Sequence, residues 1–181
     1  MEGRTSHPAN PSGSNSSLFG AWIGVILHPK ETFKKEKPNA SLKKALLQFL
    51  ICGLFWGLSM AVFASMSPLP VSGTFLLIAY LMSQIGIPVE ALILSGIVFL
   101  IAKAIGGKGN YTTQTYLISV IATPISIVLV CIQVVFLFMV VKPQGFDSLS
   151  FTSFLPVWAI NLAILAYSFY LLLLALKEAH S

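Results

Sequence analysis

The sequence has very little charge. Only 9% of its 181 residues are Asp, Glu, Lys or Arg, and 56% are hydrophobic. Soluble domains, by comparison, carry about 25% charged residues. A soluble fold of this length has too little interior to hide that much apolar surface. The composition therefore argues against an ordinary soluble domain and indicates an integral membrane protein.

Residues that support catalysis or bind metals are also scarce. His7 and His180 lie in the polar ends of the chain, and His28 lies beside a short apolar segment. None of the three has a carboxylate, a cysteine or a second histidine at ligand spacing. Cys52 and Cys131 lie inside apolar runs, which favours small buried hydrophobic side chains over a disulfide. The sequence predicts no enzyme, no metal site and no cofactor.

The net charge of +5 does not indicate a nucleic-acid partner. Seven of the eleven basic residues precede residue 45, beside the first long apolar run. Positive-inside topology produces this distribution in membrane proteins. Residues 1–17 are rich in Ser, Pro, Gly and Asn and have no apolar core, so they are not a signal peptide. We expect them to form a disordered cytoplasmic tail.

Four apolar segments are long enough to cross a bilayer, which takes about 20 residues. We expect an all-α, polytopic membrane bundle with spans at about 43–66, 87–104, 113–141 and 155–176. The apolar stretch 74–104 is too long for one upright span, and Gly86-Ile87-Pro88 interrupts it. A short outer helix near 74–85 is therefore predicted before the second span. One tilted or kinked helix is the alternative.

The distribution of lysines predicts the topology. With four spans and the N-terminus inside, ten basic residues lie inside and only Lys142 lies outside. A fifth span at 74–85 would move Lys103, Lys108 and Lys177 to the outside. The positive-inside rule therefore favours four spans with both termini in the cytoplasm.

Residues 18–27 are apolar but too short to span, and six lysines follow between Lys30 and Lys44. This pairing is typical of an interfacial helix followed by a contact with anionic lipids. The alternative is that the lysines only set the topology.

Short motifs occur around the spans in this order: Trp22, Pro29, Thr32-Phe33, Gly106-Gly107-Lys108-Gly109, Ala122-Thr123-Pro124 and residues 167–181. In order and placement they resemble prokaryotic Yip1-domain membrane proteins over residues 18–181. The resemblance implies a multi-span helical protein of the prokaryotic cell membrane and no established activity. Eukaryotic relatives are linked to membrane traffic and small GTPases. Family members generally have five spans, so this chain is a short member, is truncated, or hides a span within 74–104.

The loop Gly106-Gly107-Lys108-Gly109 lies between two spans. Gly106 is suited to end a helix with a positive φ, and Gly107 and Gly109 allow a tight turn. Consecutive N–H groups beside Lys108 form a nest for an anion such as a lipid headgroup. The alternative is a compact turn that binds nothing. The spacing is not that of a nucleotide-binding P-loop.

A few polar residues lie inside the spans. Glu90 is a candidate proton or cation site, or a carboxylate in the first turn of a helix that begins near Pro88. Gln133 and Asn161 fall at similar depth, and we expect a hydrogen bond between them across the bundle interior. Ser59 reaches a comparable level, and together with Ser95 these residues are expected to line a small polar site in the outer half. Structural contacts between helices are the alternative use.

Gly53, Gly57 and Ala61 recur every four residues on the first span. Small residues at this spacing let helix backbones approach closely. They are expected to pack the bundle together, and a homodimer contact is the alternative.

The sequence as a whole predicts a non-enzymatic membrane-organising or trafficking scaffold, or an accessory subunit of a membrane complex. Its predicted partners are the bilayer, anionic lipids, and other proteins or copies of itself. The alternative is a small transporter or channel component with a polar site near Glu90, Gln133 and Asn161.

Overall fold

The computed structural model describes residues 17–66, 71–141 and 151–181. Every regular element in this part of the chain is helical: α1 (Leu18–Leu27), α2 (Pro29–Glu36), the 3-10 turn η1 (Lys37–Asn39), α3 (Leu42–Met66), α4 (Gly73–Ala104), α5 (Tyr111–Phe136), the π-helical η2 (Leu137–Val141) and α7 (Phe151–His180). Within these described ranges, four helices are long and apolar enough to cross a membrane, which confirms the predicted helical membrane bundle. The predicted disordered tail lies outside the described residues except for Ser17.

Short polar side chains define where the helices begin. Ser17 Oγ accepts a hydrogen bond from the Gly20 N–H at 3.1 Å, and Asn110 Oδ1 accepts one from the Thr113 N–H at 2.8 Å. Ser72 and Ser41 do the same for α4 and α3, at 3.2 and 3.3 Å. Each cap satisfies a backbone donor that has no partner within its own helix.

The predicted division of residues 74–104 is wrong, because α4 runs unbroken from Gly73 to Ala104 with Pro88 inside it. A proline removes one helical hydrogen bond. Ending the helix in apolar surroundings would instead leave several backbone groups without partners, which costs more. The single long helix, weighed as the alternative, is therefore the arrangement found. The fourth helix is also longer than expected, since α7 continues to His180.

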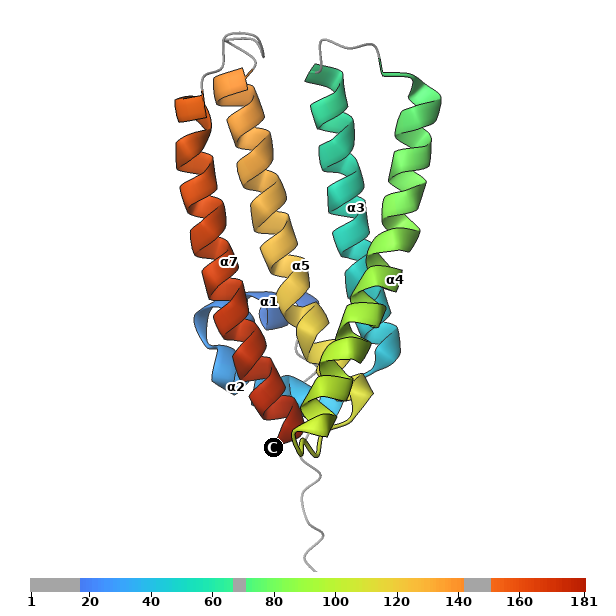
Figure 1. The fold of residues 1–181 in the computed structure, drawn as a ribbon, viewed down its shortest axis with the longest axis vertical. Helices are drawn as coiled ribbons and strands as arrows, with labels where there is room; N and C mark the ends of the chain where they lie inside the picture. The colour runs from blue at the N-terminus through green and yellow to red at the C-terminus, as the bar shows by residue number, and fades with distance from the viewer. Residues whose placement is uncertain (1–16, 67–70, 142–150) are drawn as a thin grey trace, which may run out of the picture.

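The four long helices converge at one end of the bundle and diverge toward the other (Figure 1). α3 packs on both α4 and α5, and α5 packs on α7. α1 and α2 pack against α5 and α7 beside the converging end. Exposed lysines lie on α2, at the start of α3, in the 105–110 turn and near the end of α7. We call this converging end the basic end.

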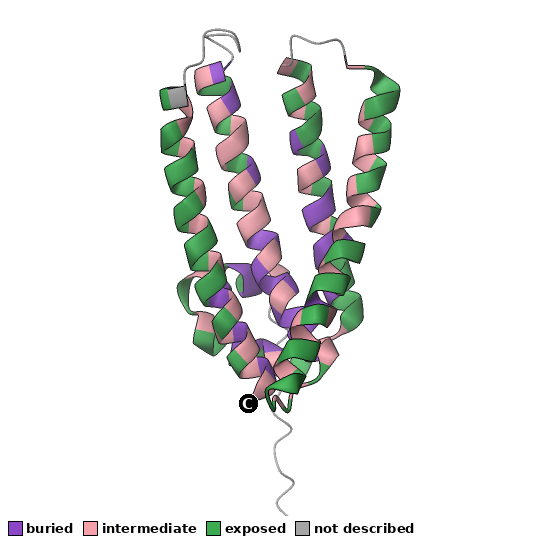
Figure 2. Cartoon of the chain, in the orientation of Figure 1, coloured by how far each residue is buried: buried purple, intermediate pink, exposed green. Residues whose placement is uncertain are grey.

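The core lies mainly in the half of the bundle that includes the basic end (Figure 2). It joins side chains from α1, α2, α3, α5 and α7, among them Val25, Phe33, Phe49, Leu117 and Leu171. The outward faces of α4 and α7 carry exposed Leu, Ile and Phe side chains. Such faces suit contact with lipid chains, because lipid chains are as apolar as these side chains.

Candidate functional site

The 105–110 turn ends α4 with a left-handed glycine. Gly106 has φ of +94°, the only positive φ among the described residues. Its N–H donates to Lys103 O at 3.0 Å, and the Gly107 N–H donates to Ala102 O at 2.8 Å. These bonds satisfy carbonyls at the C-terminal end of α4 in the way a glycine-terminated helix requires.

The other two positions of this turn let α7 approach the backbone. A Cβ on Gly109 would collide with the carbonyl oxygen of Ala179 and would lie 2.8 Å from its carbonyl carbon. A Cβ on Gly107 would collide with the His180 ring and lie 2.7 Å from Ala102 O. Glycine is thus required at both positions by the packing of the last turn of α7.

His180 connects the turn to α4 and α5 through a chain of hydrogen bonds. The Gly109 N–H donates to His180 Nδ1 at 3.2 Å, so Nδ1 is the unprotonated nitrogen. The His180 Nε2–H then donates to Gln114 Oε1 at 2.8 Å. Gln114 Nε2 donates in turn to Ser95 O at 3.0 Å. Three helices and the turn are joined in this way at the basic end.

The predicted anion nest is therefore not free to bind a ligand. The N–H groups of Gly106, Gly107 and Gly109 all donate within the protein. Lys108 is exposed. A lipid headgroup at this loop stays a prediction, and it now depends on the Lys108 side chain.

Buried polar contacts also hold α1 and α2 to the bundle, and similar contacts join α3 to α5. Trp22 Nε1–H donates to Gln48 Oε1 at 3.2 Å, and Tyr116 O–H donates to Glu36 Oε2 at 2.6 Å. The Thr123 hydroxyl donates to Ser119 O at 3.0 Å and lies 3.3 Å from Gln48 O. Buried hydrogen bonds of this kind specify one packing arrangement, because breaking any of them leaves a polar group without a partner.

The outward side of α1 and α2 is amphipathic. Phe19, Ile23 and Leu27 follow one another at every fourth position of α1 and are 69%, 58% and 63% exposed. Lys30 and Lys34 are exposed on α2, which comes next. An apolar stripe followed by lysines is the arrangement that seats a helix at a membrane surface.

A hollow of about 240 Å³ lies between α2 and α7, and we call it the lysine hollow. Its lining residues are Lys30, Phe33, Lys34, Leu174, Lys177, Glu178 and Ser181. Lys37 Nζ lies 3.8 Å from the carboxylate oxygen Oε1 of Glu178. It also donates a hydrogen bond to the backbone carbonyl oxygen of Glu178 at 2.7 Å. The three lining lysines therefore leave the hollow with excess positive charge.

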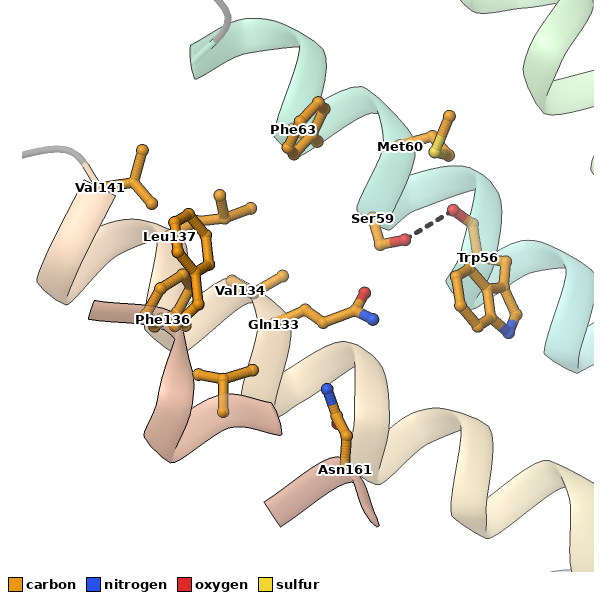
Figure 3. A pocket seen from close by; sticks show the side chains of 12 residues that line it. Trp56, Ser59, Met60, Phe63, Gln133, Val134, Phe136, Leu137, Val141 and Asn161 are labelled. Carbon is orange, nitrogen blue, oxygen red and sulfur yellow. Dashed lines mark hydrogen bonds between the residues drawn. The ribbon is translucent and has the colours of Figure 1, made fainter. Parts of the chain in front are cut away.

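A second cavity, the outer pocket, opens where α3, α5 and α7 diverge (Figure 3). Its volume is about 310 Å³. The lining residues are Trp56, Ser59, Met60, Phe63, Gln133, Val134, Phe136, Leu137, Val141, Phe154, Val157 and Asn161. Ser59, Gln133 and Asn161 all line this pocket. Ser95, which was expected beside them, does not line it, and its hydroxyl lies 2.7 Å from the Thr115 hydroxyl instead.

The polar groups of the outer pocket are only partly satisfied. Ser59 Oγ donates to Trp56 O at 2.8 Å. Asn161 Oδ1 is buried without a partner, which costs about 1–3 kcal/mol. The expected hydrogen bond between Gln133 and Asn161 is absent from the described part of the chain. The two carboxamides point into shared space without pairing (Figure 3).

Glu90 does not belong to this pocket. It is exposed, and it lies about halfway along α4, so it does not sit in the first turn of a helix. The predicted cap role for Glu90 is wrong, because α4 begins at Gly73 and continues through Pro88.

The small residues of α3 have two different environments. A Cβ on Gly53 would lie 2.8 Å from Ser83 O, and one on Gly57 would lie 2.8 Å from Ser83 Oγ. The Ser83 hydroxyl also lies 3.2 Å from Gly53 O. Gly53 and Gly57 thus lie where α3 meets α4, and Ala61, one turn further along α3, is exposed.

Sequence reasoning missed the roles of His180, Gln114 and Gln48. His180 was placed in a polar tail, although it lies one helical turn after Lys177. The available signal was the position of both glutamines inside apolar spans, where a carboxamide needs a partner.

Comparisons with known proteins agree with this architecture. The family described as Yip1 domain matches residues 23–181, which is most of the chain. Searches among curated proteins and solved structures found no match. The matched region includes every long helix, the 105–110 turn and His180. The chain therefore belongs to the Yip1 domain family.

Proposed function

We propose that this protein is a non-enzymatic membrane component that acts through contacts of its basic end with anionic lipids and with other proteins. In this role it is a membrane-organising or trafficking scaffold, or an accessory subunit of a larger complex. The basic end faces the cytoplasm of a prokaryotic cell, with both termini inside. The observation that carries the proposal is the lysine hollow beside the amphipathic surface of α1 and α2.

The chemistry of the hollow suits an anionic headgroup. Lys30, Lys34 and Lys177 supply positive charge from two helices, and Phe33 and Leu174 supply apolar contact. The exposed stripe of α1 offers an apolar surface to the neighbouring lipid chains. Each lysine near an anionic membrane surface contributes about 1 kcal/mol. Three of them are worth roughly 3 kcal/mol, or about a hundredfold in affinity.

The test is a titration of the purified protein with phosphatidylglycerol in detergent, followed by native mass spectrometry. The variant K30Q/K34Q/K177Q is expected to bind this lipid roughly a hundredfold more weakly than the wild type. The matched control K35Q/K43Q/K103Q removes the same charge from exposed lysines that do not line the hollow. It should lose much less affinity, and phosphatidylcholine binding should change little in either variant.

Equal losses in the two triple variants would show that the lysines act only through overall charge, and the hollow would not be a site. Lys108 is tested by a separate variant. Weaker phosphatidylglycerol binding by the single variant Lys108→Gln would support headgroup binding at the 105–110 turn.

The transporter alternative has less support. The outer pocket brings Gln133, Asn161 and Ser59 together, but Glu90 is not among its lining residues. A proton-coupled site needs its ionisable group at the site itself.

A further inference from the structure

We propose that the outer pocket binds a neutral, diacylglycerol-type lipid: an uncharged molecule with apolar chains, ester carbonyls and a free hydroxyl. This site lies away from the basic end and does not depend on the lysine hollow. It would add a specific lipid ligand to a protein whose proposed role concerns anionic headgroups.

The lining of the pocket selects against charge. None of its twelve lining residues is ionisable. A phosphate or carboxylate placed there would lose its hydration without gaining an ion pair, which is strongly unfavourable. The occupant is therefore a neutral molecule.

The two carboxamides define the polar part of the ligand. Gln133 and Asn161 extend into the pocket from α5 and α7 (Figure 3). Each carboxamide has donors and an acceptor. The Asn161 amide nitrogen points toward Gln133, and Asn161 Oδ1 is buried without a partner (Figure 3). A ligand carbonyl accepts from the amide N–H groups, and a ligand hydroxyl donates to the Gln133 amide oxygen. An ester of glycerol with one free hydroxyl provides both.

The apolar walls accommodate the rest of the molecule. Phe63 and Trp56 come from α3, and Phe136 and Phe154 lie with ring centroids 5.4 Å apart. The volume of about 310 Å³ lies at the lower end of the range for small-molecule sites. It takes the glyceryl ester and the first part of a chain. The remaining chain length extends between the diverging helices into the bilayer.

The end of α5 forms one wall of the pocket. Residues Leu137–Val141 follow α5 as a π-helix, and both Leu137 and Val141 line the pocket. The wider turn of a π-helix shapes this wall, which lies opposite α3.

The experiment uses the full chain in detergent and 1,2-dioleoylglycerol as the probe, with binding read by native mass spectrometry. One molecule is expected to bind to the wild type. The variant Q133L/N161L should bind at least tenfold more weakly, because leucine keeps the side-chain size but removes the hydrogen bonds. Gln84→Leu is the matched control, since it removes a carboxamide from α4 that does not line the pocket. Its binding should equal that of the wild type.

Thermal unfolding distinguishes a lipid-binding role of Asn161 from a purely structural role. Asn161→Leu should raise the unfolding temperature of the lipid-free protein, because it removes a buried acceptor without a partner. It should also lose the upward shift that dioleoylglycerol gives the wild type. Val157→Phe, which fills the pocket, should remain folded and abolish binding. The proposal is overturned if Q133L/N161L binds like Gln84→Leu, or if dioleoyl phosphatidylglycerol competes as well as dioleoylglycerol does.

Discussion

Replacing Gly109 with alanine is expected to detach the last turns of α7 from the basic end. The new methyl group would occupy the position of the Ala179 carbonyl, which is backbone and does not rotate away. The shift would break the bond from the Gly109 N–H to His180 and the bond from His180 to Gln114. Overpacking and the two lost hydrogen bonds together cost about 3 kcal/mol.

Hydrogen–deuterium exchange in detergent would locate this effect. Backbone amides near residues 171–181 should exchange faster in Gly109→Ala, whereas those of α3 should change little. Gly86→Ala is the matched control, because a Cβ at that helical position meets nothing within 4 Å. Alanine there should not speed exchange at residues 171–181, and it should add up to about 1 kcal/mol of stability. Unchanged exchange in Gly109→Ala would contradict the close packing described for this turn.

Replacing Gly53 with valine should separate α3 from α4. The added Cβ would approach Ser83 O to 2.8 Å and Gln84 Cα to 3.3 Å, and both are backbone atoms. The helices must move apart, and the contact between the Ser83 hydroxyl and Gly53 O is lost. Overpacking of this kind costs about 2–3 kcal/mol. The measurement is thermal unfolding in detergent.

Ala61→Val gives the matched control on the same helix. Ala61 is exposed, so valine there should change the stability by no more than about 0.5 kcal/mol. Light scattering of both variants tests the homodimer interpretation of the small residues. If Ala61→Val changes the oligomeric state and Gly53→Val does not alter stability, the stripe serves contacts between copies.

The long helices were predictable because length and hydropathy are local properties. Residues 43–66 and 18–27 were placed within one residue of α3 and α1. The comparable depth of Gln133 and Asn161 also followed from counting residues along straight helices. Both side chains line the outer pocket, although the predicted hydrogen bond between them is absent from the described part of the chain.

The errors came from features that depend on the surroundings of a residue. Pro88 was interpreted as a helix boundary. It lies inside α4 instead, because a helix surrounded by lipid has no water to satisfy the backbone groups that a break would free. His180 and Gln114 are 66 positions apart, and Trp22 and Gln48 are 26 apart. No local pattern shows that such residues meet. Gly107 and Gly109 were predicted to form a turn, but the backbone of α7 packed on them belongs to a distant part of the chain.

The convergence of the helices gives the two ends of the bundle different mechanical properties. At the basic end, hydrogen bonds through His180 and Gln114 join α4, α5 and α7 to one another. The opposite ends lie apart, and most of the buried residues lie in the other half of the bundle (Figures 1 and 2). A thinner or thicker bilayer changes helix tilt at small cost. When helices that are joined at one end tilt, the distance between their other ends changes. Bilayer thickness would therefore set the spacing between the outer ends of α4 and α7.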